Sequence, residues 1–217
     1  VPRYGAHHEL GATAALCVGA SSTLGGAAPL PPPSPAVAHA PLMPLHGSWG
    51  SRVEMVVRLL LSLRAAAEAA GDSAAAKAVV FSRHEAVLRL LQAACAMNGV
   101  RALRYGTTSQ LHAEAATFIA DTSVHALLLS AQRDASGLTL TAASHVVIVE
   151  PQPDVAIEQQ MIGRVYRIGQ MRQTHVHRVV VDGSFETVVV DDRLAAEAGA
   201  AGGGGAASHL LPLRDTE

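Results

Sequence analysis

The feature that most constrains the fold is a regular alternation between short, uninterrupted apolar runs and longer segments with apolar residues at helical spacing. The runs, such as Ala78-Val-Val-Phe81 and Val146-Val-Ile-Val149, are short and contain β-branched residues. Strands that are apolar at every position are buried on both faces, which is typical of a parallel sheet covered by helices. Strands are therefore expected at 78–81, 100–105, 126–129, 146–149 and 176–181, and helices at 52–70, 84–97, 109–120 and 154–162.

The alternation predicts an α/β fold with a parallel sheet and helices on both of its faces. In sheets of this kind, ligands bind where the carboxyl ends of the strands meet. The loops that follow residues 82, 130 and 150 are therefore expected to carry the functional side chains.

The two ends of the chain have a different composition from the middle. Residues 1–47 are rich in Ala, Gly, Pro and Ser, and four consecutive glycines occupy 202–205. Such segments bury too little apolar surface to offset the entropy lost on ordering. We therefore expect a disordered linker over 1–47, one domain over 48–192 and a flexible tail over 193–217. Because the chain begins at Val1 and carries no secretory pattern, it is expected to be a piece of a longer protein.

Composition narrows the possible functions. The chain has 16 Lys and Arg against 18 Asp and Glu, so its net charge of −2 argues against strong non-specific DNA binding by the whole surface. A local basic strip could still contact phosphates. Aromatic residues make up only 3%, which argues against a base-stacking surface for single strands. No apolar run reaches the roughly 18 residues that a membrane span needs.

The sequence gives little support for a metal site. His175 and His177 alternate on an expected strand, so both imidazoles would point to one face. A metal pair is geometrically possible there, but no third ligand is evident, and the alternative is an ordinary edge or surface strand. Cys17 and Cys95 match no zinc spacing, which favours a reduced, intracellular protein with no bound metal.

The densest chemical signal lies between Gln160 and Gln170. Arg164 and Arg167 are three residues apart, on one helical face or on the turn that leaves the helix. A guanidinium group binds phosphate oxygens with a fork of donors, while Gly163 permits another backbone to approach and Gly169 permits a tight turn. This layout suits stabilisation of the charge on a transferring phosphoryl group. The alternative is a helix with two solvated arginines and a glycine at its end.

The string Gln-x-x-Gly-Arg-x-x-Arg-Ile-Gly-Gln resembles motif VI of the Swi/Snf family, within helicase superfamily two. Other segments resemble the family's motifs in the family's order, and the resemblance covers about 47–190. The segment 47–54 is similar to the lead-in helix of the SHPRH-type branch, in which a RING ubiquitin-ligase module interrupts the ATPase. The remaining matches are 77–82 with motif IV, 104–108 with the segment after it, 130–140 with motif V, and Glu150-Pro151 with the acidic strand end.

The resemblance implies a RecA-like lobe and a role for each matching residue. Arg164 and Arg167 would be arginine fingers that reach ATP held by a first lobe. Gln160, Gly137 and Gly163 would lie at the nucleotide. Ser82 and Thr139 correspond to positions near the DNA backbone, although a strand-end hydroxyl at Ser82 could instead cap the following helix.

By the same resemblance, the chain is expected to be the C-terminal lobe of an ATP-dependent double-stranded DNA translocase. It would act in the nucleus, in chromatin remodelling or DNA repair that this branch couples to ubiquitin ligation. Its partners would be double-stranded DNA or chromatin and the first lobe of the same protein. The chain contains neither a Gly-x-x-x-x-Gly-Lys-Ser/Thr loop nor an Asp-Glu-x-His pair. ATP and Mg²⁺ would be held mainly by the first lobe, and this chain alone is not expected to hydrolyse ATP.

Four positions depart from the family pattern. Asp134 and Ala135 replace two glycines of motif V, and a carboxylate near a triphosphate repels it. Tyr166 replaces the usual His of motif VI, and Tyr105 replaces an Asp. These changes keep open a second hypothesis, a degenerate, non-catalytic module that binds DNA or protein. A stand-alone small-molecule enzyme of flavodoxin-like shape is a third, without a matching motif.

Overall fold

The structure is a computed structural model that describes residues 14–20, 43–72, 76–105, 108–132, 137–152, 154–181, 184–190 and 210–211. The strands are β1 (Ala14–Ala20), β2 (Ala78–Ser82), β3 (Ala102–Arg104), β4 (Ala126–Ser130), β5 (His145–Ile148), β6 (His175–Val181) and β7 (Leu210–Leu211). The helices are α2 (Ser51–Ala70), α3 (Glu85–Met97), α4 (Thr108–Ala120) and α5 (Val155–Val165). Residues 185–190 are also helical.

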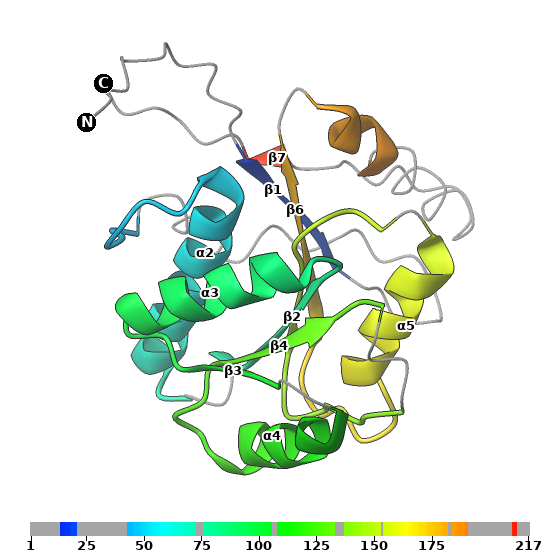
Figure 1. Cartoon of the computed structure of the whole chain (residues 1–217). Coiled ribbons are helices and arrows are strands. Elements are labelled where there is room, and N and C mark those ends of the chain that lie inside the picture. The colour runs from blue at the N-terminus through cyan, green and yellow to red at the C-terminus, as the bar shows by residue number, and fades with distance from the viewer. Residues whose placement is uncertain are drawn as a thin grey trace.

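The strands form one sheet in the order β3-β4-β2-β5-β6-β1-β7 (Figure 1). The five strands from β3 to β6 are parallel, with Ser82 beside Ser130 and Phe81 beside Ile148. Their carboxyl ends therefore meet at one edge of the sheet. The predicted α/β fold with a parallel sheet is confirmed.

Two antiparallel strands extend the sheet beyond β6. β1 pairs with β6, with Ala14 opposite Val181, and β7 pairs with β1. Both strands fall in the segments 1–47 and 193–217, for which the sequence predicted no regular structure. Most other residues of those segments lie outside the described part of the chain.

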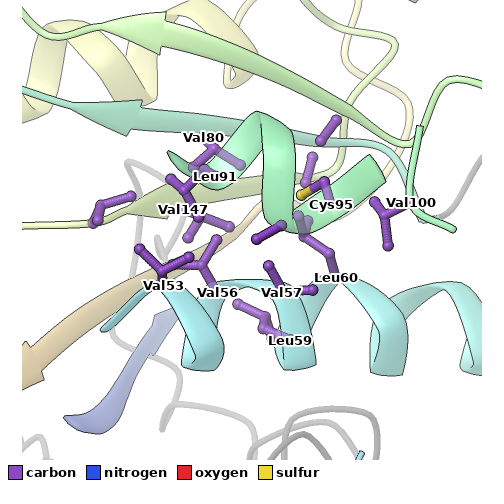
Figure 2. Close-up of a cluster of buried hydrophobic side chains, with 14 of the residues drawn as sticks. Val53, Val56, Val57, Leu59, Leu60, Val80, Leu91, Cys95, Val100 and Val147 are labelled. Carbon is purple, nitrogen blue, oxygen red and sulfur yellow. The ribbon is translucent and has the colours of Figure 1, made fainter. Parts of the chain in front are cut away.

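Each face of the parallel sheet carries its own apolar core, because alternate strand residues point to opposite faces. Val80 and Val147 face α2 and α3, whose Val56, Leu60 and Leu91 pack against them (Figure 2). On the other face, strand residues pack against α4 and α5 through Leu111, Phe118, Met161 and Val165. Helices thus cover both faces, as predicted, with α2 and α3 on one side and α4 and α5 on the other (Figure 1).

Helix α2 ends at a glycine, whereas α5 continues past one. Gly71 adopts a left-handed conformation with φ 70°, and its N–H donates to the carbonyl of Glu68, which ends α2. The sequence predicted that α5 ends near residue 162, whereas it continues to Val165. Met161 and Val165 lie four apart and both face the sheet, so burial carries the helix past Gly163.

On α4, Phe118 faces the sheet, whereas Ile119 is 47% exposed. Consecutive helical residues are about 100° apart, so the two neighbouring side chains point in different directions.

The edge or surface position expected for the strand of His175 and His177 is wrong, because β6 lies between β5 and β1 and His177 is buried.

Candidate functional site: a groove at the carboxyl edge of the sheet

An open groove of about 290 Å³ lies at the carboxyl ends of β2 and β4, beside α5. Gln160 and Arg164 line it from the helix, and Ser130, Ala131 and Gln132 line it from the end of β4 and the loop that follows. Phe81, Ile157 and Met161 form its apolar wall. The edge of the sheet predicted to hold the function therefore brings two of the predicted site residues together. Asp134 and Ala135, farther along the loop after β4, lie outside the described residues.

Helix α5 orients the side chains of the groove. It begins at Asp154, whose side chain accepts a hydrogen bond from the N–H of Ala156 at 2.8 Å. Gln160 and Arg164 are four residues apart, so they share one face of the helix and reach the groove together. Arg164 lies in the last turn, where the helix dipole favours a positive charge.

Arg167 lies beyond the helix, in an exposed turn that ends at Gly169. Gly169 has φ 98°, a conformation that favours glycine, which confirms the predicted tight turn. The Nη1 group of Arg167 donates a hydrogen bond to Oγ1 of Thr139 at 3.1 Å. In the described residues, no carboxylate forms a salt bridge with Arg167, and its side chain stays at the surface.

The segment that contains Thr139 is also joined to α5 through the backbone. The N–H of Leu140 donates to the carbonyl of Arg164 at 2.9 Å. Gln170 adds a second link, because its Nε2 donates to the carbonyls of Ala143 (2.7 Å) and Val165 (3.2 Å). The motif V-like and motif VI-like segments therefore form one connected unit. Sequence reasoning gave Gln170 no role, although an amide directly after a turn glycine can close that turn.

Ser82 occupies a different environment from the one that a phosphate contact requires. It is fully buried, and its hydroxyl donates to Oε1 of Glu150 at 2.8 Å while accepting from the N–H of His84 at 3.1 Å. The other oxygen of Glu150 accepts from the N–H of Arg83 at 3.2 Å. The alternative cap on α3 is not formed, since the N-cap residue is His84 and makes no side-chain cap bond. Ser82 and Glu150 thus tie the end of β2 to the segment after β5.

Comparison with known families identifies this architecture. The family model of the helicase conserved C-terminal domain matches residues 53–169, which include the groove, Thr139 and both arginines. The chain belongs to this family. The matched segment runs from the first turn of α2 to the turn at Gly169 and includes four of the five parallel strands, β2 to β5.

Named relatives agree with this assignment. The domain is 34% identical over 144 residues to the E3 ubiquitin-protein ligase SHPRH of Homo sapiens, a match that covers 66% of this chain and 8% of the relative. It is 35% identical over 117 residues to DNA repair protein RAD5A of Arabidopsis thaliana, covering 52% of this chain and 11% of that protein. The C-terminal part of the Fun30 ATPase domain shares the fold, with a TM-score of 0.60 at 19% identity over 68% of this chain and 47% of that one. The predicted Swi/Snf-type, RecA-like lobe is confirmed.

Two glycines of the helicase domain have no steric reason for being glycine within the described residues. Gly137 and Gly163 are exposed, neither has a positive φ, and a Cβ at either position would meet no atom within 4 Å. A glycine inside a helix costs about 1 kcal/mol relative to alanine. Gly163 therefore lowers helix stability with no steric benefit within the described residues.

The side chains at the groove suit an anion better than a metal. Arg164 and Gln160 offer N–H donors, and no carboxylate is among the described side chains that line the groove. Phosphate oxygens fit this donor set, whereas Mg²⁺ needs oxygen ligands. Nowhere in the described ranges do three His, Cys, Asp or Glu side chains form a group that could hold a metal ion.

None of the described helices combines the length and apolar character that a membrane span requires.

Proposed function

We propose that this domain completes the ATPase site of a Swi/Snf-type DNA translocase, with Arg164 and Arg167 as arginine fingers. One observation carries the proposal: Arg167 is exposed in the turn directly after α5, without a carboxylate partner in the described residues, and Gln160 and Arg164 on that helix line the groove. Guanidinium groups held at a surface in this way can reach a nucleotide bound by a second lobe.

For phosphoryl transfer, this domain would need to supply only positively charged side chains held in the right position. Phosphoryl transfer spreads negative charge over the equatorial oxygens, and guanidinium groups stabilise that charge without moving a proton. Arg167 would leave Thr139 and donate to these oxygens as the lobes close, while Arg164 and Gln160 would donate from the helix. ATP and Mg²⁺ would be held mainly by the first lobe, because the phosphate loop is absent from this chain. Closing and opening of the lobes would then drive movement along double-stranded DNA.

For the DNA contacts, we propose different roles for the two hydroxyl residues. Thr139 is exposed and can reach a phosphate, and its bond to Arg167 would couple DNA contact to the nucleotide side. Ser82 is buried against Glu150, so we propose that it holds the loop after β2 in place instead of touching DNA directly. Because the chain as a whole has a net charge of −2, this lobe would need the first lobe to grip DNA.

The setting of the whole protein also remains a proposal. One relative is named a ubiquitin-protein ligase and another a DNA repair protein, and both are much longer than this chain. We propose a nuclear protein that acts on DNA or chromatin during repair or remodelling. Gly137 and Gly163 would let the first lobe or the nucleotide approach, since nothing in the described residues occupies the space above them.

The test is the ATPase rate of the intact protein that carries both lobes, with Arg167→Ala. A missing arginine finger lowers kcat by roughly 10³–10⁵, and the KM for ATP should change far less because the first lobe holds the nucleotide. Arg89→Ala is the matched control, because Arg89 is an exposed arginine on α3, on the other face of the sheet. An Arg167→Ala rate equal to that of the control would exclude the finger role.

A non-catalytic module is the second candidate, favoured by Asp134 and Ala135 in place of motif V glycines. This hypothesis predicts that ATP causes no closure of the lobes. Titration of the two-lobe protein with ATP, followed by the distance between labels on the two lobes, separates the candidates. A distance that does not respond to ATP supports the module.

A further inference from the structure

Helix α5 is fastened to the sheet by a buried ion pair between Glu158 and Arg178. The Nε group of Arg178 donates to Oε1 of Glu158 at 2.5 Å, and the two side chains are 6% and 4% exposed. In the pairs Arg52–Glu186, Arg64–Glu68, Arg101–Asp121, Arg104–Glu85 and Arg172–Asp72, both side chains are at least 19% exposed. The pair of Glu158 and Arg178 is therefore much more deeply buried than these five.

The pair joins the helix that carries the site to a strand outside the groove. Glu158 lies in the first turn of α5, on the same face as Met161 and Val165. Arg178 lies in β6, beside Ile148 of β5. Gln160 and Arg164, two and six residues after Glu158, line the groove from the same helix. The ion pair and these groove residues therefore share α5.

The two kinds of contact beneath α5 constrain the helix differently. Apolar contacts at Met161 and Val165 hold the helix at its distance from the sheet, but they are non-directional. A charge-assisted hydrogen bond to a planar guanidinium is short and directional. The helix rises about 1.5 Å per residue. A small slip or rotation of α5 would therefore displace Arg164 and the turn that carries Arg167.

We propose that Glu158 and Arg178 are positioning residues, which set the axial position and rotation of α5 so that Gln160, Arg164 and Arg167 meet the nucleotide. This inference rests on the proposed function. A buried ion pair is not required for stability, because apolar side chains of similar volume often serve as well or better. Catalytic groups, in contrast, must be held within about 0.5 Å, and a displacement of about 1 Å can cost roughly 100-fold in rate.

The double variant Glu158→Leu with Arg178→Met separates positioning from stability in the two-lobe protein. Both members of the pair are removed together, so neither is left as a buried charge without the other, and the thermal midpoint should be unchanged or higher. The kcat for ATP should fall at least ten-fold, while the KM for ATP should stay within about two-fold because the first lobe holds the nucleotide. A kcat within two-fold of the unaltered protein overturns the proposal.

A second variant, Arg178→Lys, keeps the charge and replaces the planar fork with a single ammonium. It retains a buried pair if the double variant fails to fold, and its kcat should fall several-fold. An unchanged kcat in Arg178→Lys also overturns the proposal. The exposed pair Arg64 and Glu68 on α2 is the matched control, and Arg64→Met with Glu68→Leu should leave kcat unchanged.

Arg167→Ala in the same preparation distinguishes the two possible failures. If Arg167→Ala lowers the rate and the double variant does not, the positioning role is wrong and the proposed function stands. If Arg167→Ala keeps the full rate, the proposed function fails and the positioning role fails with it. A fall in kcat in both variants, with KM preserved, supports both.

Discussion

Arg167 donates a hydrogen bond to the hydroxyl of Thr139 at 3.1 Å, which joins the turn after α5 to the segment that leads out of the loop after β4. The backbone bond from Leu140 to Arg164 runs beside it. The residue that we propose for the nucleotide and the residue that we propose for the DNA backbone therefore touch within this domain. A substitution of Thr139 or Arg167 should therefore alter the position of the other side chain.

We predict that Thr139→Val weakens DNA engagement, because the methyl group that replaces the hydroxyl cannot bond to a phosphate. A single hydrogen bond is worth about 0.5–1.5 kcal/mol, so half-maximal stimulation of ATPase activity should need roughly 2–10 times more DNA. Titration of the two-lobe protein with duplex DNA measures this. Thr139→Ser keeps the hydroxyl and should stay close to the unaltered protein. An equal DNA requirement in Thr139→Val would remove the phosphate contact from the proposal.

Gly163→Ala should act in opposite directions on stability and activity. The added Cβ meets no atom within 4 Å in this domain, and alanine is the better helix former, so the domain should gain about 0.5–1 kcal/mol in urea unfolding. In the two-lobe protein, the same Cβ would obstruct an approaching lobe or nucleotide and lower kcat.

Gly71→Ala is the contrasting control for that experiment. Gly71 has φ 70°, so alanine is strained there, and the domain should lose about 1 kcal/mol with no specific effect on kcat. If Gly163→Ala stabilises the domain and leaves kcat intact, no partner surface approaches this part of α5.

The sequence predicts the parallel sheet well because its strands are buried on both faces, and burial leaves a continuous apolar run such as 126–129. It does not predict β1 or β7, since an Ala- and Gly-rich segment carries no such signal. β1 forms by pairing with the edge of β6 that β5 leaves open, and β7 pairs with β1. The predicted end of α5, near residue 162, is too early, because the helix continues until Val165 is buried against the sheet.

The polar contacts of the site are harder to predict than its motifs. Gln160 and Arg164 come from one short string, so their shared helical face follows from a spacing of four residues. Glu158 and Arg178 are 20 positions apart, and Ser82 and Glu150 are 68 apart. Their pairing is decided by the register of separate strands and helices, which no periodicity within one element reveals.

The contacts of Lys77 also depend on tertiary structure, and they predict that its side chain stabilises the folded domain. Its buried ammonium group donates to the carbonyls of Phe118, Ile119 and Asp121 at the end of α4, and it lies 5.0 Å from the centre of the Phe118 ring. Burial lowers the pKa of Lys77. Lys77→Met should leave these carbonyls without their donor and cost about 1.5–3 kcal/mol in urea unfolding. Arg89→Met, a change of an exposed cation on α3, should cost much less.

The buried histidines should make the domain sensitive to mild acid. His177 is fully buried, Nδ1 of His145 lies 3.0 Å from its Nε2, and the ring of His175 is stacked near His145. Burial, together with the charges of His145 and His175, lowers the pKa of His177 well below 6.5, and burial also lowers the pKa of His175. The unfolded chain therefore binds protons below pH 6.5 that the folded domain does not.

Lower pH should therefore destabilise the folded domain. The stability contributed by neutral His177 is fully present above pH 6.5 and is lost as the pH falls below it, by up to about 1.4 kcal/mol per pH unit for one proton. Urea unfolding at pH 7.5, 6.5 and 5.5 should show stability nearly constant over the first interval and falling over the second. His177→Leu removes one titrating group, so its stability should fall less steeply between pH 6.5 and 5.5. An equally steep fall in that variant would show that the acid sensitivity arises from other groups.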